Sequence, residues 1–172
     1  MKKFALVLNI LLLASGLTSF AQEDKSKRPS PPQTVKEKLA SGANLTIDYS
    51  SPSIKGRSIG KDLEPMPGKV WRAGANEATV IEFDKDVTIE GKNLPAGKYA
   101  FFTIDNGAEW TLIFNKTWNQ WGAYDYKENT DALRVNVKAD KAPSFTEKLT
   151  YKVADGKVWM LWGDKAVSFT VA

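Results

Sequence analysis

The chain has 172 residues, of which 24 are Lys or Arg and 20 are Asp or Glu, and it contains no histidine and no cysteine. The formal net charge of +4 is scattered along the sequence, so no basic cluster indicates binding to nucleic acid. Without cysteine the chain forms no disulfides, and without histidine it also lacks the commonest metal ligand and the commonest general base. The composition therefore predicts no metal site and no other cofactor.

Residues 1–21 have the pattern of a secretory signal peptide. Two lysines precede an apolar run over residues 4–13, and Ser19 and Ala21 place small side chains where a signal peptidase reads them. The apolar run is too short to span a bilayer. We therefore expect export to the periplasm or the extracellular space, with no stable membrane insertion after cleavage. An uncleaved membrane anchor is the alternative.

The next segment, residues 22–33, mixes charged side chains with three prolines and includes no large apolar residue. Such a segment contributes nothing to a hydrophobic core, so we predict a flexible linker. The length of the remainder, residues 34–172, suits a single domain with one core.

Apolar and polar side chains alternate over most of this domain, which is the period of half-buried β-strands. Residues 35–49 predict a hairpin with its turn at 41–42. Residues 99–104 are apolar on both faces and predict a strand that is covered on both sides. The other predicted strands cover residues 80–83, 87–89, 110–114, 133–137, 145–153, 158–162 and 167–171, with a turn at 163–165.

No segment of any length has a helical period, and turn residues recur at regular spacing. The sequence therefore predicts an all-β protein, a single antiparallel β-sandwich or flattened barrel of about nine to ten short strands.

Residues 51–68 interrupt the alternation with several prolines and glycines, which makes a long loop for a compact domain. Long loops of this kind are often functional, and Arg57 marks this one as a candidate rim for a binding site. A solvated crossover between sheets is the alternative.

Two further segments crowd polar and aromatic side chains into a strand-rich sequence. Residues 71–77 place a guanidinium, an amide and a carboxylate among small residues, and residues 117–126 combine four aromatic rings with amides and an acid. Rings and amides suit a glycan, a peptide or a small anionic metabolite. The candidate ligand-binding residues are Arg57, Trp71, Arg72, Asn76, Glu77, Asn119, Gln120 and Trp121.

Structural roles for the same residues remain open. Arg72 and Glu77 can form an ion pair between neighbouring strands, and Trp118 and Trp121 can cover the end of a sandwich. A metal-independent hydrolase would use Glu77 as its general acid or base, but no second carboxylate lies at a defined spacing and we predict no catalytic residue.

Four stretches, residues 50–57, 68–79, 94–99 and 119–124, closely resemble the successive signatures of the bacterial family called domain of unknown function 2911. The resemblance extends from about Ser30 to the end of the chain. It implies a secreted or periplasmic protein, of a family frequent in Bacteroidetes-type bacteria, and it implies no particular activity.

Three readings of function follow from these residues. The first is an exported β-sandwich binding module in which the two polar segments form one cleft, with Arg57 and Arg72 holding an anionic or hydroxyl-rich group. The second is a structural or interaction protein of the cell envelope in which the same residues brace loops to the sheet. The third is the hydrolase that uses Glu77.

Overall fold

The computed structural model describes residues 24–172. The predicted signal peptide lies outside the described residues, as do the first two residues of the predicted linker. The described chain contains two single-turn 3-10 helices, η1 (Lys25–Lys27) and η2 (Glu128–Thr130), and ten strands. The strands are β1 (Pro32–Lys38), β2 (Asn44–Ser50), β3 (Val70–Trp71), β4 (Thr79–Phe83), β5 (Val87–Ile89), β6 (Lys92–Leu94), β7 (Gly97–Asp105), β8 (Glu109–Asn115), β9 (Asp131–Ala154) and β10 (Lys157–Thr170).

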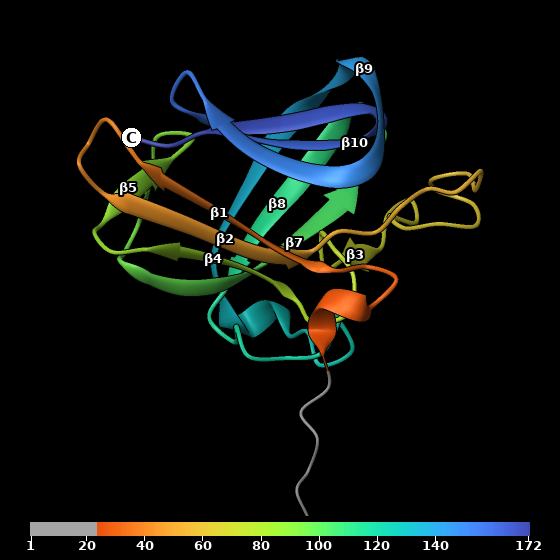
Figure 1. Cartoon of the computed structure of the whole chain (residues 1–172). Helices are drawn as coiled ribbons and strands as arrows, with labels where there is room; N and C mark the ends of the chain where they lie inside the picture. The colour runs from red at the N-terminus through yellow and green to blue at the C-terminus, as the bar shows by residue number, and fades with distance from the viewer. Residues whose placement is uncertain (1–23) are drawn as a thin grey trace, which may run out of the picture.

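One antiparallel sheet dominates the molecule, in the order β1-β2-β4-β7-β8-β9-β10, with β3 paired to β7 and with β5 and β6 forming a separate small sheet. The main sheet curls so that β9 and β10 lie opposite β1 and β2 (Figure 1). Its two ends meet where Tyr49 on β2 packs edge-on against Tyr151 on β9, with ring centroids 4.7 Å apart. The all-β antiparallel prediction is confirmed, and the sheet forms a sandwich-like half-barrel.

The last two strands differ from the prediction in their length. Residues 163–165 do not turn but continue β10, which runs to Thr170 beside the 24-residue β9. The pairing of the two strands shifts register around Gly163, where the backbone has φ +61°. An irregularity of this kind bends a strand without ending it. Gly163 and the two charged residues after it were therefore compatible with a turn or with a continuous, bent strand.

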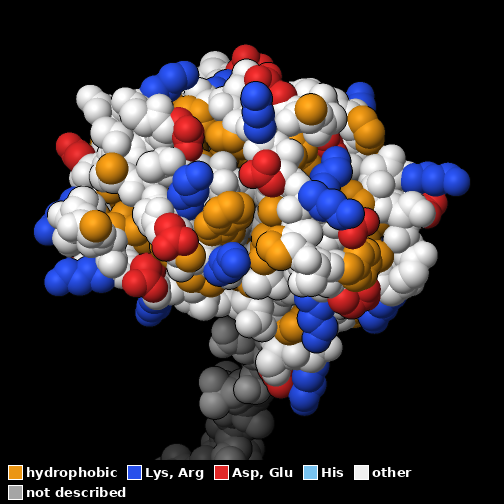
Figure 2. All heavy atoms as spheres, turned by 90° about the horizontal axis from the view of Figure 1, so that it is seen from above, with side chains coloured by type: hydrophobic (Ala, Val, Ile, Leu, Met, Phe, Trp, Pro, Cys, Tyr) orange, Lys and Arg blue, Asp and Glu red, His pale blue; other side chains and the backbone are white. Residues whose placement is uncertain are grey.

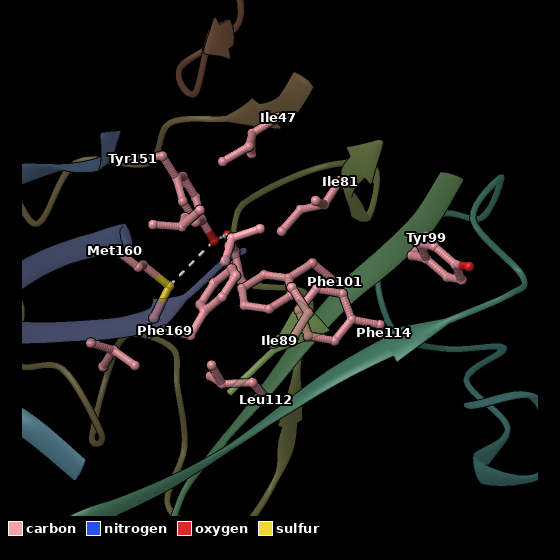
Figure 3. Packing of buried hydrophobic residues seen from close by; sticks show 14 of the residues in the cluster. Ile47, Ile81, Ile89, Tyr99, Phe101, Leu112, Phe114, Tyr151, Met160 and Phe169 are labelled. Atoms are coloured by element: carbon pink, nitrogen blue, oxygen red, sulfur yellow. Dashed lines mark hydrogen bonds between the residues drawn. The ribbon is translucent and has the colours of Figure 1, made fainter. Parts of the chain in front are cut away.

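The core lies inside the curl and is rich in aromatic rings (Figure 3). Phe101 on β7 packs against Phe114, Phe169 and Tyr151, with ring centroids 5.3, 5.7 and 6.4 Å apart. These rings are almost fully buried, as is Ile47 across the core. With no disulfide available, this packing supplies the stability of the fold.

Strand β7 is buried on its other face as well, as its sequence predicts. Phe102 is fully buried there and packs against Tyr126, with ring centroids 5.2 Å apart. Tyr126 belongs to the loop between β8 and β9, so the aromatic-rich segment predicted as a site folds down over the outer face of the sheet. This second small core also contains Ala78, Ala100 and Ile113.

For residues 24–33 the structure differs from the prediction of a flexible linker. β1 begins at Pro32 and pairs with β2 from its first residue, and Lys25 and Arg28 make ion pairs with Glu77. Polar and hydrogen-bonding contacts, which need no apolar side chain, hold this segment against the domain. Neither 3-10 helix in the described part of the chain has the length or apolarity to cross a membrane.

The face that Figure 2 shows carries Lys and Arg side chains interspersed with Asp and Glu, and small apolar areas lie between them. Mixed charge of this kind is typical of an ordinary solvated protein surface.

Candidate functional site

The two polar segments singled out in the sequence lie side by side in the structure. The backbone N–H of Ala78 donates to Gln120 O at 3.1 Å, and that of Gly122 donates to Asn76 O at 3.1 Å. Glu77 and Trp121 form an antiparallel bridge between these bonds. The loop after β8 is therefore fastened along the segment between β3 and β4, as a common site would require.

The backbone from Arg72 to Thr79 is tightly folded and well supported. Ala73 has φ +50°, a conformation that is uncommon for a residue with a side chain. Its carbonyl accepts hydrogen bonds from Thr79 Oγ1 at 2.9 Å and Tyr151 Oη at 2.7 Å. Burial raises the pKa of Tyr151 well above its ordinary value, so the hydroxyl stays protonated and remains a donor. The core thus fixes the loop that carries Arg72.

A pocket of ≈ 260 Å³ opens beside this loop. Four of the predicted residues line it: Arg57, Trp71, Arg72 and Asn76. The remaining walls come from residues that sequence reasoning did not select: Ser30, Pro52, Leu63, Glu64, Gly74, Ala75 and Trp162. Trp162 and Glu64 are themselves joined, because Trp162 Nε1 donates to the Glu64 carbonyl oxygen at 2.8 Å.

Arg72 is the unusual residue among those that line this pocket. Its Nε is buried and has no hydrogen-bond partner, and no carboxylate within residues 24–172 forms an ion pair with it. The Arg72–Glu77 ion pair, which was the alternative structural role of these residues, does not form. A partly buried cation without a partner is costly to keep, and an anionic ligand would satisfy it.

Arg57 and Asn76 are already partly engaged with the protein. Arg57 is exposed at the rim of the pocket, and its guanidinium donates to the carbonyls of Ile54 and Ser53 at 3.0 and 2.6 Å. Asn76 Nδ2 donates to Ser30 O at 3.0 Å, which leaves its side-chain oxygen as an acceptor. Both residues lie at the pocket's edge, and the charged residues that line the pocket are Arg57, Arg72 and Glu64.

Trp71 does not offer a stacking surface. Only 2% of its surface is exposed, and its Nε1 donates to Gly74 O at 3.1 Å. The ring forms part of the core beneath the pocket, so this candidate residue offers a ligand almost no surface.

Glu77 does not line this pocket, and the amino-terminal segment neutralises its charge. Its carboxylate lies 2.7 Å from Lys25 Nζ and 3.1 Å from Arg28 Nη1. Desolvation by burial would by itself raise the pKa of Glu77, but hydrogen bonds from Lys25, its own backbone N–H and Arg28 outweigh it and hold the pKa at about 2. A carboxylate held ionised in this way is poorly suited to general acid or base catalysis near neutral pH.

We expect Glu77→Gln to make stability less dependent on acid pH. The folded pKa of about 2 lies below the ordinary value of 4.5, so these ion pairs stabilise the fold above about pH 4.5 and are lost as the pH falls toward 2. The side chain is 38% exposed, so solvent screening limits the gain to about 1 kcal/mol or less. Urea unfolding near neutral pH and near pH 3 measures the difference in free energy of unfolding between the parent and Glu77→Gln. Glu82→Gln is the control for an exposed ion pair. If this difference in free energy of unfolding did not become smaller at pH 3, the ion pairs of Glu77 would not be what stabilises the fold near neutral pH.

The remaining predicted residues lie on the outer loop. They do not line the pocket of ≈ 260 Å³ described above, which we call the Arg72 pocket. Trp121 is 53% exposed, with the Arg28 guanidinium 5.9 Å from its ring centroid, and Asn119 is exposed beside it. Gln120 Nε2 donates to Thr117 O, while its Oε1 is buried without a partner. The structure thus differs from the prediction of one common cleft: the two segments meet, but their side chains divide between a pocket and an aromatic surface.

In the part of the chain that the structure describes, no cluster of three or more His, Cys, Asp or Glu side chains is arranged to hold a metal ion. Arg57, Arg72 and Glu64 give the pocket two cations and one carboxylate, and Asn76 adds an amide.

Fold and site together define an all-β protein with a polar pocket between the β3–β4 segment and the loop before β3. The family model for DUF2911, described as a protein of unknown function, matches residues 30–171, and the chain belongs to this family. No curated protein and no solved structure matches the chain.

Proposed function

We propose that the protein is an exported binding module that holds a small anionic or hydroxyl-rich ligand in the Arg72 pocket. The observation that carries this proposal is that Arg72 lines the pocket, forms no ion pair with any described residue and has a buried Nε without a hydrogen-bond partner. Export follows from the signal-peptide pattern of residues 1–21.

The pocket's other groups suit such a ligand. Arg57 adds a second cation at the rim, and the side-chain oxygen of Asn76 can accept a hydrogen bond from a hydroxyl. Its volume of ≈ 260 Å³ matches a metabolite or a single sugar unit better than a long chain.

Arg72→Gln tests the proposal, with glucuronate and its neutral analogue glucose as probes in isothermal titration calorimetry. We expect glucuronate to bind more tightly than glucose and its affinity to fall at least about tenfold in Arg72→Gln, since a hydrogen bond to a charged group contributes about 1.5–3 kcal/mol. Lys38→Gln removes the same charge from an exposed position on β1 and is the matched control. Equal glucuronate affinity in parent and Arg72→Gln would refute the proposal.

The same variant separates ligand binding from bracing at Arg72. Because no described group pairs with the guanidinium, we expect Arg72→Gln to unfold at the same temperature as the parent or slightly higher. A bracing role for Arg72 requires the melting temperature to fall by several degrees.

Bracing remains the better-supported role for Glu77, because Lys25 and Arg28 both bind its carboxylate. In this second candidate function, Glu77 fastens the amino-terminal segment to the domain. It accompanies the binding pocket and does not replace it.

A further inference from the structure

A second pocket of ≈ 300 Å³ adjoins the Arg72 pocket and has a different chemistry. Its walls are mainly apolar, and Ile54, Ile59, Phe145, Trp162 and Gly163 supply them. The polar residues at its margin are Arg57, Ser58, Asp164 and Lys165. We call it the Phe145 pocket.

The two pockets share Arg57 and Trp162 as lining residues. Hydrogen bonds to the carbonyls of Ser53 and Ile54 hold Arg57, and the bond to Glu64 O holds Trp162. The same two fixed side chains therefore border an uncompensated cation on one side and an apolar surface on the other.

The apolar surface of this pocket is exposed. Phe145 is 58% exposed, whereas Trp162 behind it is buried. At Gly163 an added Cβ would lie 2.7 Å from Ile59 Cδ1 and 3.9 Å from a ring carbon of Phe145. The missing side chain lets Ile59 approach β10 closely, and the Phe145 ring lies near the same glycine. An exposed apolar surface next to a pocket often marks a place where a ligand binds.

The charges around the Phe145 pocket are largely compensated. Lys165 Nζ binds Asp105, a residue that is only 4% exposed, and Asp164 adds an acidic group at the margin. An anionic group is therefore attracted toward Arg72 and toward the Arg57 that both pockets share, which sets the orientation of any molecule that occupies both.

We propose that the ligand is an amphipathic anion whose charged group binds Arg72 and whose flat apolar group lies against Phe145. This inference rests on the proposed function, because it assigns the orientation and chemical class of the ligand of the Arg72 pocket. A carboxylate or phosphate joined to an aromatic ring has this chemistry.

Inorganic phosphate and phenyl phosphate test it, at a pH where both carry the same charge. We expect phenyl phosphate to bind about tenfold more tightly than phosphate, because the ring leaves water for an apolar surface. Phe145→Ala should reduce the ratio of phenyl phosphate affinity to phosphate affinity to near one, without changing the affinity for phosphate. Arg72→Gln should weaken the binding of both anions.

Tyr124→Ala is the matched control, because Tyr124 is 84% exposed and lines neither pocket. Phe145 is exposed too, so both variants are expected to fold, and thermal unfolding verifies this. Equal affinities of the parent for the two anions, or a ratio unchanged in Phe145→Ala, would overturn the inference and leave the proposed function standing. Failure of both anions to bind the parent would overturn the two together.

Discussion

Replacing Phe101 by alanine is expected to lower the free energy of unfolding by about 3–5 kcal/mol. Phe101 is 1% exposed, and its ring contacts three other aromatic rings from three different strands. Removing it leaves a cavity at the point where β7, β8, β9 and β10 meet, and the surrounding rings are too rigid to fill it completely. Urea or guanidinium unfolding at equilibrium measures the loss.

Phe145→Ala provides the contrast for the same side-chain truncation. Because the Phe145 ring is more than half exposed, its removal should change stability by no more than about 0.5 kcal/mol. If the two truncations had similar effects, the ring cluster inside the curl would not be the main source of stability.

Phe101 also illustrates why the sequence predicted this part of the fold. Residues 99–102 are apolar at consecutive positions, and such a strand is stable only if both of its faces are covered. The structure covers one face with the ring cluster and the other with Tyr126 and its loop. The periodicity showed that a cover exists, but the identity of the covering segment depends on tertiary structure.

The long strands β9 and β10 were harder to predict, because local turn residues compete with long-range pairing. Gly163 and its charged neighbours have the composition of a turn. Pairing of Gly163 with Thr146, and of Lys165 with Lys141, keeps the strand continuous through the irregularity. The pairing partner lies about twenty residues away, beyond the range of any local pattern.

The candidate site was predicted only in part, because local sequence patterns do not show which distant residues meet in the folded chain. Arg72 and Asn76 were recognisable because polar groups interrupt an apolar pattern, and both line the pocket. Trp162 had the same apolar surroundings as any core residue, so nothing local marked it as a wall of the pocket. Lys25 and Arg28 lie in a segment without large apolar residues, and their ion pairs with Glu77 appear only once the chain has folded.

The loop that carries Arg72 depends on a close approach of backbone at Gly74. An added Cβ at this position would lie 2.6 Å from Thr79 Oγ1 and 3.3 Å from Ser50 O. Thr79 is fully buried, so its side chain has little room to move, and its hydroxyl is one of the two donors to Ala73 O. The backbone conformation that presents Arg72 to the pocket therefore requires the smallest side chain at residue 74.

Gly74→Ala is accordingly expected to destabilise the protein by about 2–4 kcal/mol, the sum of overpacking and a lost buried hydrogen bond. Equilibrium unfolding measures this loss. Thr79→Ala alone removes the hydroxyl and should cost about 1 kcal/mol. In the double variant the contact between Cβ and Oγ1 is absent, so its destabilisation should be clearly smaller than the sum of the two single effects. Additive effects would mean that the steric conflict at Thr79 is not what requires glycine at residue 74, and that the loop carrying Arg72 is held by other contacts.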